Sequence, residues 1–149
     1  MAVLSEFERY SQQIKLAEIG IQGQKKLQQA KVLCIGAGGI GATLLPYLAG
    51  AGVGTIGIID NDFIEEGNLH RQILYQEIDI SKAKAAVAKM KLNTLNSNIH
   101  IEDYAFRLTA DNVEELIVQY DLVADCSDNF YTRYLAHDVC YRLGKPYVY

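Results

Sequence analysis

Cysteine is scarce in this sequence, and none of it is closely paired. The 149 residues include three cysteines, Cys34, Cys126 and Cys140, without any Cys-x-x-Cys spacing. An odd number without that spacing argues against a disulfide scaffold and against a zinc site of paired cysteines. Cys34 lies in an apolar run, so we expect it to be buried as a small hydrophobic residue. For Cys126, packing is favoured over reactive chemistry.

Excess basic charge and long apolar runs are also missing. Lys and Arg number 14 against 18 Asp and Glu, which gives a net charge of −4 and a pI near 5.3. The lysines are scattered, which argues against a basic surface for nucleic acid. No apolar run reaches the roughly 18 residues of a membrane span, and residues 1–13 do not read as a signal peptide. We therefore expect a cytoplasmic protein without nucleic-acid or membrane partners.

What the sequence does contain is enough apolar residues for one core. Half of the residues are hydrophobic, and a chain of this length buries about 68–70% of its unfolded surface. We therefore expect one domain.

Residues 145–149 read as a strand that has only begun after a helix. We therefore interpret the sequence as a fragment or a truncated gene product.

A glycine-rich turn stands between two apolar segments. Gly36-Ala37-Gly38-Gly39-Ile40-Gly41 follows the run Lys31–Ile35, and Asp60 closes the next apolar run. Strand, glycine turn, helix, strand and acid occur in this order in nucleotide-binding βαβ units. Glycines let the backbone approach a phosphate, the helix N-terminus offers free N–H groups, and the acid binds ribose hydroxyls. The pattern favours nucleotide binding over a turn kept only for packing.

Residues further along the chain distinguish a dinucleotide from a triphosphate. A triphosphate brings more negative charge and a metal ion, so it needs cations and a carboxylate. Arg71 and Lys84, both expected at the mouth of the site and not in the core, can supply the positive charge. Asp128 follows the apolar run 122–124, where a magnesium ligand would lie. These residues favour ATP with Mg²⁺. The glycine turn alone leaves an NAD-dependent oxidoreductase as an alternative.

Several motifs occur in a fixed order. They are Arg9-Tyr10, AGAGVG at 49–54, NLHRQ at 68–72, the lysine at 84 and DCSDN at 125–129. Over nearly the whole chain they resemble the ThiF/MoeB/HesA family, the bacterial relatives of the ubiquitin-activating E1 enzymes. The resemblance implies ATP-dependent adenylation of the C-terminal carboxylate of a small ubiquitin-like protein, one that carries sulfur for thiamine or molybdopterin synthesis.

The resemblance also implies which residues hold the nucleotide. Carried over position by position, the contacts fall on Gly39, Asp60, Asn68, Arg71, Lys84, Asp128 and Asn129. We also expect the other glycines of the turn, Gly36, Gly38 and Gly41, and Asp62 to bind the nucleotide. Arg71, Lys84 and Asp128 take the catalytic role, with Asp128 as the Mg²⁺ ligand. A carboxylate attacks the α-phosphorus and pyrophosphate leaves, so catalysis consists mainly of alignment and charge neutralisation.

The sequence departs from the family pattern in two places. The family carries Arg-Tyr-x-Arg-Gln near its N-terminus, and the second arginine reaches into the neighbouring subunit; here Gln12 takes that position. Either Arg9 compensates or adenylation is slower. The family's zinc site of two Cys-x-x-Cys pairs is absent from this chain. A non-catalytic nucleotide-binding or partner-binding module is therefore the main alternative to an adenylyltransferase.

Aromatic and aliphatic residues indicate a subunit interface on the N-terminal helix and a core-facing side of the last predicted helix. The resemblance implies a homodimer in which the N-terminal helix lies across the neighbour, and the apolar residues Phe7, Tyr10, Ile14 and Leu16 allow this. On the last predicted helix, Tyr131, Tyr134 and Tyr141 form a stripe with Leu135 and Val139 that we expect to face the core.

The expected architecture is a doubly wound, Rossmann-like α/β domain with a mainly parallel sheet and helices on both faces. A helical arm is predicted over 1–28, with Ser5 and Glu8 as a capping box, followed by the nucleotide-binding domain over 29–149. Strands are predicted at 32–35, 55–59, 99–104 and 122–124, and helices at 40–51, 81–95, 111–120 and 129–143.

Overall fold

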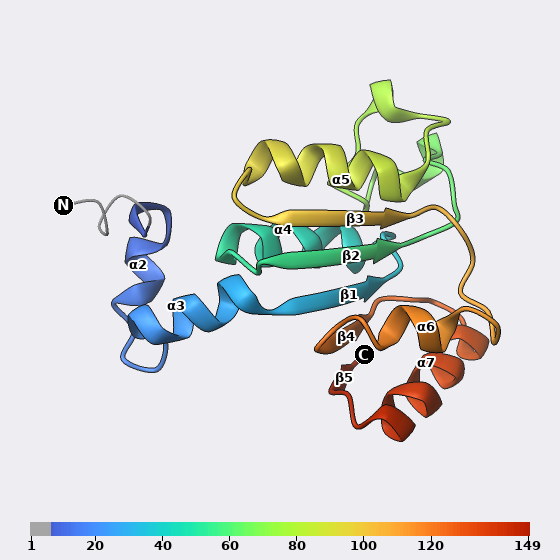
Figure 1. Ribbon diagram of the computed structural model, residues 1–149. Coiled ribbons are helices and arrows are strands. Elements are labelled where there is room, and N and C mark those ends of the chain that lie inside the picture. Colours follow the sequence, from blue (N-terminus) through green and yellow to red (C-terminus); the bar gives the residue numbers. More distant parts are fainter. Residues whose placement is uncertain (1–6) are drawn as a thin grey trace.

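A single parallel sheet forms the centre of the molecule. The computed structural model describes residues 7–149, so the capping box predicted at Ser5 lies outside it. The strands run in the order β3-β2-β1-β4-β5, all parallel (Figure 1). Their bounds are β1 Lys31–Ile35, β2 Thr55–Ile59, β3 His100–Tyr104, β4 Leu122–Asp125 and β5 Tyr147–Val148. The predicted doubly wound fold is confirmed.

Helices cover the two faces of this sheet. They are α4 Gly41–Ala51, α5 Lys84–Leu95, α6 Val113–Ile117 and α7 Phe130–Leu143. Two further helices, α2 Ser11–Ile14 and α3 Gly20–Gln29, precede β1 and extend away from the sheet (Figure 1). Short 3₁₀ turns are η1 Glu8–Tyr10, η2 Glu66–Asn68 and η3 Glu77–Asp79. Alternate strand residues enter two cores: Cys34, Ile56 and Ile58 pack with α4 and α5, and Leu33, Ile35 and Val123 pack with α6 and α7. Within the described residues, no helix is both long and apolar enough to cross a membrane.

The strand order positions the functional site. The chain builds β1, β2 and β3 outward in one direction, then returns to place β4 on the other side of β1. At such a reversal the loops after neighbouring strands turn to opposite faces, which opens a crevice at the carboxyl ends of the strands. The glycine turn after β1 and the loop after β4 border this crevice.

Two helices are shorter than the sequence predicts. The helix predicted over 81–95 begins at Lys84, because Ser81 has a positive φ of 69° and Ala83 bridges to Phe63. The helix predicted over 111–120 is α6, which spans only Val113–Ile117.

The N-terminal segment uses its apolar residues within its own chain. Phe7 and Tyr10 are buried, and the Tyr10 hydroxyl accepts a hydrogen bond from Asn96 Nδ2 at 2.9 Å. A Cβ on Gly52 would lie 2.5 Å from the Tyr10 ring, so the ring rests against a position that must be glycine. The prediction that Phe7 and Tyr10 serve a subunit interface is therefore wrong. Of the other two members of that set, Ile14 is half-buried and Leu16 is 54% exposed.

The tyrosines of α7 were also assigned to the wrong face. Tyr131, Tyr134 and Tyr141 are 61%, 66% and 83% exposed. The buried face of α7 consists of Thr132, Ala136, Val139 and Cys140, mostly small residues. Small side chains let the helix axis approach the sheet closely, and the large rings then lie on the outer side.

Candidate nucleotide site

A cavity of about 990 Å³ opens at the carboxyl ends of β1, β2 and β4. It is bordered by the glycine turn, the loops after β2 and β4, and the start of α7. Its charged lining residues are Asp60, Asp62, Arg71, Lys84, Arg107, Asp128 and Arg133. Of the predicted site residues, all except Gly41 lie on its wall.

Two glycines of the turn are required by the backbone itself. Gly36 has a φ of +91°, and a Cβ there would lie 3.0 Å from the Cys126 carbonyl oxygen. A Cβ on Gly41 would lie 2.0 Å from the Gly36 carbonyl oxygen, so no other residue fits. Gly41 therefore sits behind the cavity wall and shapes the turn instead of facing a ligand.

The other two glycines leave space on the cavity side. A Cβ on Gly38 or Gly39 would meet only Gln72 Nε2 at 3.7 Å or the Arg71 side chain at 3.9 Å, both ordinary contacts. Within residues 7–149, no protein acceptor is bonded to the N–H groups of Gly38, Gly39 or Ile40. Free N–H groups at the start of a helix, here α4, form an anion-binding site.

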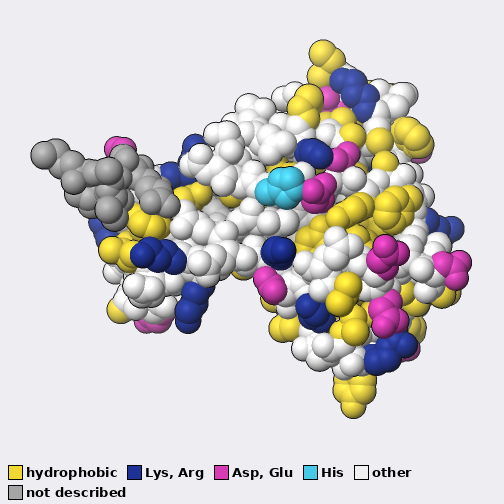
Figure 2. Space-filling model, in the orientation of Figure 1, with side chains coloured by type: hydrophobic (Ala, Val, Ile, Leu, Met, Phe, Trp, Pro, Cys, Tyr) yellow, Lys and Arg dark blue, Asp and Glu magenta, His cyan; other side chains and the backbone are white. Residues whose placement is uncertain are grey.

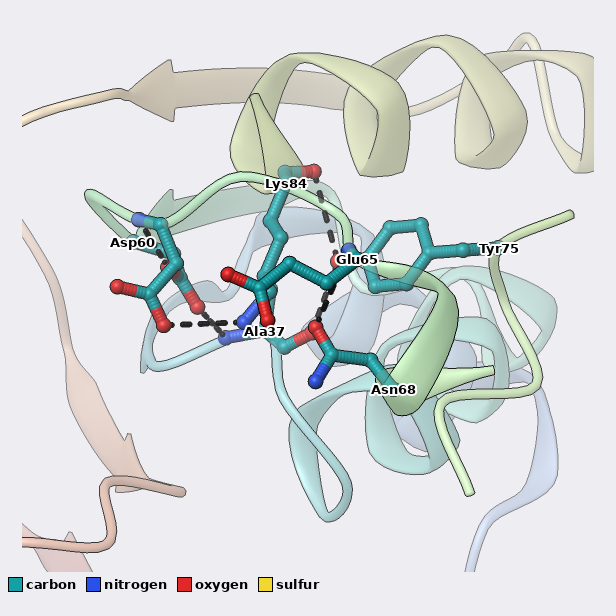
Figure 3. Close-up of polar contacts among 7 residues, drawn as sticks. Ala37, Asp60, Glu65, Asn68, Tyr75 and Lys84 are labelled. Carbon is teal, nitrogen blue, oxygen red and sulfur yellow. Dashed lines mark hydrogen bonds and ion pairs between the residues drawn. The ribbon is translucent and has the colours of Figure 1, made fainter. Parts of the chain in front are cut away.

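Asp60 ties the glycine turn to the end of β2. Its carboxylate accepts hydrogen bonds from the Ala37 N–H at 2.7 Å and the Asp62 N–H at 2.8 Å (Figure 3). Burial raises the pKa of Asp60, while these two hydrogen bonds and the nearby Lys84 oppose the rise. Asp60 thus orients the turn and still borders the cavity.

Lys84 is buried instead of lying at the mouth of the site, where we expected it. The residue is 5% exposed, and its Nζ lies 3.0 Å from Asp62 Oδ2. Nearby, the Tyr75 hydroxyl donates to the Ala37 carbonyl oxygen at 2.8 Å (Figure 3). Burial raises the pKa of Tyr75, so it remains a neutral donor that holds the turn.

Arg71 lies over the glycine turn. Its side chain is exposed, passes Gly39, and donates from Nη1 to the Gly67 carbonyl oxygen at 3.2 Å. The Asn68 side chain is partly engaged with the backbone, since its Oδ1 accepts a hydrogen bond from the Glu65 N–H at 3.3 Å. Arg71 therefore keeps most of its guanidinium donors for a ligand.

Gln72 is a site residue that the sequence analysis left out. It is 3% exposed, its Oε1 is buried without a donor, and its amide faces Gly38. An unpaired buried polar atom is costly and is often explained by a missing ligand or water. Its position beside Arg71 in the motif at 68–72 could have identified Gln72 as a site residue.

The opposite wall carries Asp128 and two arginines. Asp128 is exposed to the cavity, while Asn129 caps α7 by accepting from the Thr132 N–H at 2.9 Å. Arg133 donates from Nη2 to the Ser127 carbonyl oxygen at 2.8 Å, and Arg107 borders the same space. Both arginines were missed, because nothing in their local sequence separates them from ordinary surface arginines.

Asp128 can serve a magnesium ion only together with a bound phosphate. No group of three or more His, Cys, Asp or Glu side chains in the described part of the chain could hold a metal. Mg²⁺ in nucleotide sites is bound through one or two carboxylates plus phosphate oxygens and water. A single carboxylate opposite the glycine turn fits that kind of binding.

Cys126 borders the cavity next to Cys34. Their Sγ atoms are 3.9 Å apart, and Cys126 is half-buried whereas Cys34 is fully buried. The hydrogen bond from Cys34 lowers the pKa of Cys126. The same bond, together with burial, raises the pKa of Cys34.

Charge elsewhere on the surface is mixed. Over the described residues on the face drawn in Figure 2, Lys and Arg side chains are interspersed with Asp and Glu. The cavity wall is mixed as well, with four basic and three acidic side chains.

The fold and the turn define a protein of the Rossmann type, with a cavity for a phosphate-bearing ligand at the reversal of strand order. The chain matches the ThiF family over residues 10–149 and belongs to it. The predicted family is therefore confirmed.

Curated relatives share nearly half of the aligned residues. The sulfur carrier protein adenylyltransferase of Thermus thermophilus is 46% identical over 97% of this chain and 53% of its own length. The probable molybdopterin-synthase adenylyltransferase of Porphyra purpurea is 44% identical over 98% of this chain and 38% of its own. The chain thus spans about half of the first relative and less of the second.

Solved structures agree with this family. The tRNA N6-threonylcarbamoyladenosine dehydratase TcdA of E. coli, in complex with ATP, has a TM-score of 0.89 at 25% identity, over 95% of this chain and 58% of its own. MccB of E. coli with ATP has a TM-score of 0.77 at 35% identity, over 83% of this chain and 37% of its own.

Proposed function

We propose that this chain is the ATP-binding part of an enzyme that adenylates the C-terminal carboxylate of a small ubiquitin-like sulfur carrier. The main observation is that free N–H groups of the glycine turn, Arg71 and Asp128 converge on one cavity. The curated relatives named as adenylyltransferases, and the two related structures with ATP, support the proposal.

The residues present suit this chemistry. The free N–H groups of the turn and the Arg71 guanidinium would bind phosphate oxygens, and charge-assisted bonds of this kind are strong. Lys84 lines the same cavity and adds positive charge, and Asp62 holds it in place. Asp128 would hold Mg²⁺, which supplies further positive charge to the phosphates. Attack by a carboxylate on the α-phosphorus needs no protein nucleophile, so alignment and neutralisation are what the chain provides.

Finer parts of the proposal rest on the family resemblance. They are a carrier for thiamine or molybdopterin synthesis, a homodimer, a cytoplasmic location, Mg²⁺ as the metal, and a division into an arm at 1–28 and a nucleotide-binding domain at 29–149. The arrangement in Figure 1, where α2 and α3 extend away from the sheet, supports the last of these.

ATP–pyrophosphate exchange tests the proposed function. The chain is assayed with ATP, Mg²⁺ and a sulfur-carrier protein ending in a free carboxylate, and exchange is expected only with all three. ATP binding without exchange would instead support the non-catalytic nucleotide-binding module. Tighter binding of NAD than of ATP in parallel titrations would contradict the nucleotide assignment.

A further inference from the structure

Two thiols that are far apart in sequence meet at the base of the cavity. Cys34 lies in β1 and Cys126 directly after β4, 92 residues away, and their Sγ atoms are 3.9 Å apart. The parallel pairing of β1 with β4 produces this contact, because it sets Cys34 opposite Ala124 and Ile35 opposite Asp125.

The two thiols differ in access. Cys34 is 0% exposed, whereas Cys126 is half-buried and lines the cavity. A small molecule that enters the cavity can therefore reach Cys126 but not Cys34. Cys140 is buried in the other core and packs among apolar residues, so it offers a control.

We propose that Cys126 is a thiol-modification site that takes small-molecule disulfides from the cavity, with Cys34 as the second thiol that completes an internal disulfide. Cys126 sulfur attacks one sulfur of the small disulfide, loses its proton to solvent, and releases one thiol. Cys34 sulfur then attacks Cys126 Sγ, loses its proton, and releases the second thiol. In sum, the two cysteines lose two hydrogens and the small disulfide becomes two thiols.

The geometry allows the second step with a short movement. A disulfide has an S–S length of about 2.05 Å, and the two sulfurs lie 3.9 Å apart, close to van der Waals contact. Cys126 is the half-buried member of the pair and lines the cavity, so its side chain is the less confined of the two.

Formation of this bond would disturb the glycine turn. A Cβ on Gly41 would lie 3.6 Å from Cys126 Cβ, and Cys34 Sγ lies 3.4 Å from the Gly36 carbonyl oxygen. The disulfide therefore joins β1 to the segment after β4, and the glycine turn contacts both cysteines. An oxidised chain is expected to bind a phosphate-bearing ligand several-fold more weakly, and a bound ligand is expected to shield Cys126.

Incubation with glutathione disulfide, followed by intact-mass measurement and peptide mapping, tests the proposal. The native chain and Cys140→Ser should each lose two hydrogens and show a Cys34–Cys126 cross-link. Cys34→Ala should instead stop at one glutathione adduct on Cys126, and Cys126→Ser should not form the cross-link. If Cys34→Ala does not fold, trapping of the transient Cys126 adduct in the native chain at short times provides the same information.

Two outcomes would overturn the proposal: a persistent glutathione adduct on Cys126 of the native chain, or reaction at Cys140 ahead of Cys126. This arm contains no nucleotide, so it is independent of the proposed function. In a second arm, saturating ATP should slow the cross-link. Failure of ATP to bind at all would contradict the proposed function and leave the cross-link result intact.

Discussion

At the scale of single residues, four neighbouring glycines have two different reasons to be glycine. Gly36 and Gly41 are fixed by close backbone contacts, whereas Gly38 and Gly39 face the cavity across ordinary contact distances. The same turn therefore contains positions that determine folding and positions that determine how closely a ligand can approach.

Alanine substitutions separate these two roles. Gly41→Ala should prevent or severely weaken folding, because its Cβ would lie 2.0 Å from a backbone oxygen. Gly39→Ala should fold with stability within about 1 kcal/mol of the native chain, and should bind ATP more weakly because the methyl group occupies the phosphate side. Chemical denaturation and calorimetric ATP titration measure the two effects. A Gly41→Ala chain with native stability would contradict the turn geometry.

Arg71 should affect binding without affecting stability. Its guanidinium makes one exposed contact with Gly67, so Arg71→Ala should leave the unfolding free energy unchanged. Loss of a charge-assisted phosphate bond should weaken ATP binding by about 1.5–3 kcal/mol. Arg142→Ala, which removes an exposed arginine paired with Glu114, is the control. Equal ATP affinity in both variants would refute the role of Arg71.

At the scale of elements, an ion pair of one buried carboxylate connects η3 to α5. Asp79 is 2% exposed, and its carboxylate lies 2.5 Å from Lys91 Nζ and 3.6 Å from Lys82 Nζ. Burial by itself raises the pKa of Asp79, but the hydrogen bonds from Lys91 and the Gln76 N–H lower it on balance. This carboxylate holds the loop that leads into Lys84.

A lowered pKa makes the contribution of Asp79 depend on pH. The folded state stabilises the ionised form, so the contribution is full above the unfolded pKa of about 3.9 and is lost as pH falls through the lower folded value. Asp79→Asn should destabilise the chain at pH 7 by about 1–3 kcal/mol, and this difference should shrink below pH 4. Urea unfolding across pH measures it, with exposed Asp111→Asn as control. A difference that stays constant down to the lowest pH would contradict the ion-pair explanation.

At the scale of the whole molecule, the contacts of the N-terminal arm bear on the proposed crossing between subunits. Arg9 donates from Nη1 to the Leu95 carbonyl oxygen at 3.0 Å, so it is engaged within its own chain. Gln12 is exposed and accepts from Lys15 Nζ at 3.0 Å. These contacts favour position 12 over position 9 as the one that could face a partner's site in the proposed homodimer.

Restoring the charge at position 12 tests that arrangement. Gln12→Arg should tighten ATP binding by about 1 kcal/mol, because a charge-assisted bond replaces a neutral one at the partner's phosphates. Gln22→Arg, on the exposed part of α3, should have no effect. Sedimentation and ATP titration are measured on both variants. A dimer whose ATP affinity ignores Gln12→Arg would show that the crossing-arm proposal is wrong.

Local sequence was sufficient for the framework of this protein. The strands at 55–59 and near 31–35, the helix start after the glycine turn, and the acid at the end of β2 all follow from patterns within a few residues. Gly36 and Gly41 were also identifiable, since a turn this tight has few chemical solutions. The predicted α/β fold and family depended on such local features and their order.

Contacts between distant segments decided the rest. The burial of Tyr10 depends on Gly52 and Asn96, and the outward position of the α7 tyrosines depends on which helix face approaches β4. The approach of Cys126 to Cys34 depends on strand pairing. A hydrophobic pattern specifies that a side chain needs burial, but the choice of partner is made by the tertiary fold, because it alone brings the two surfaces into contact.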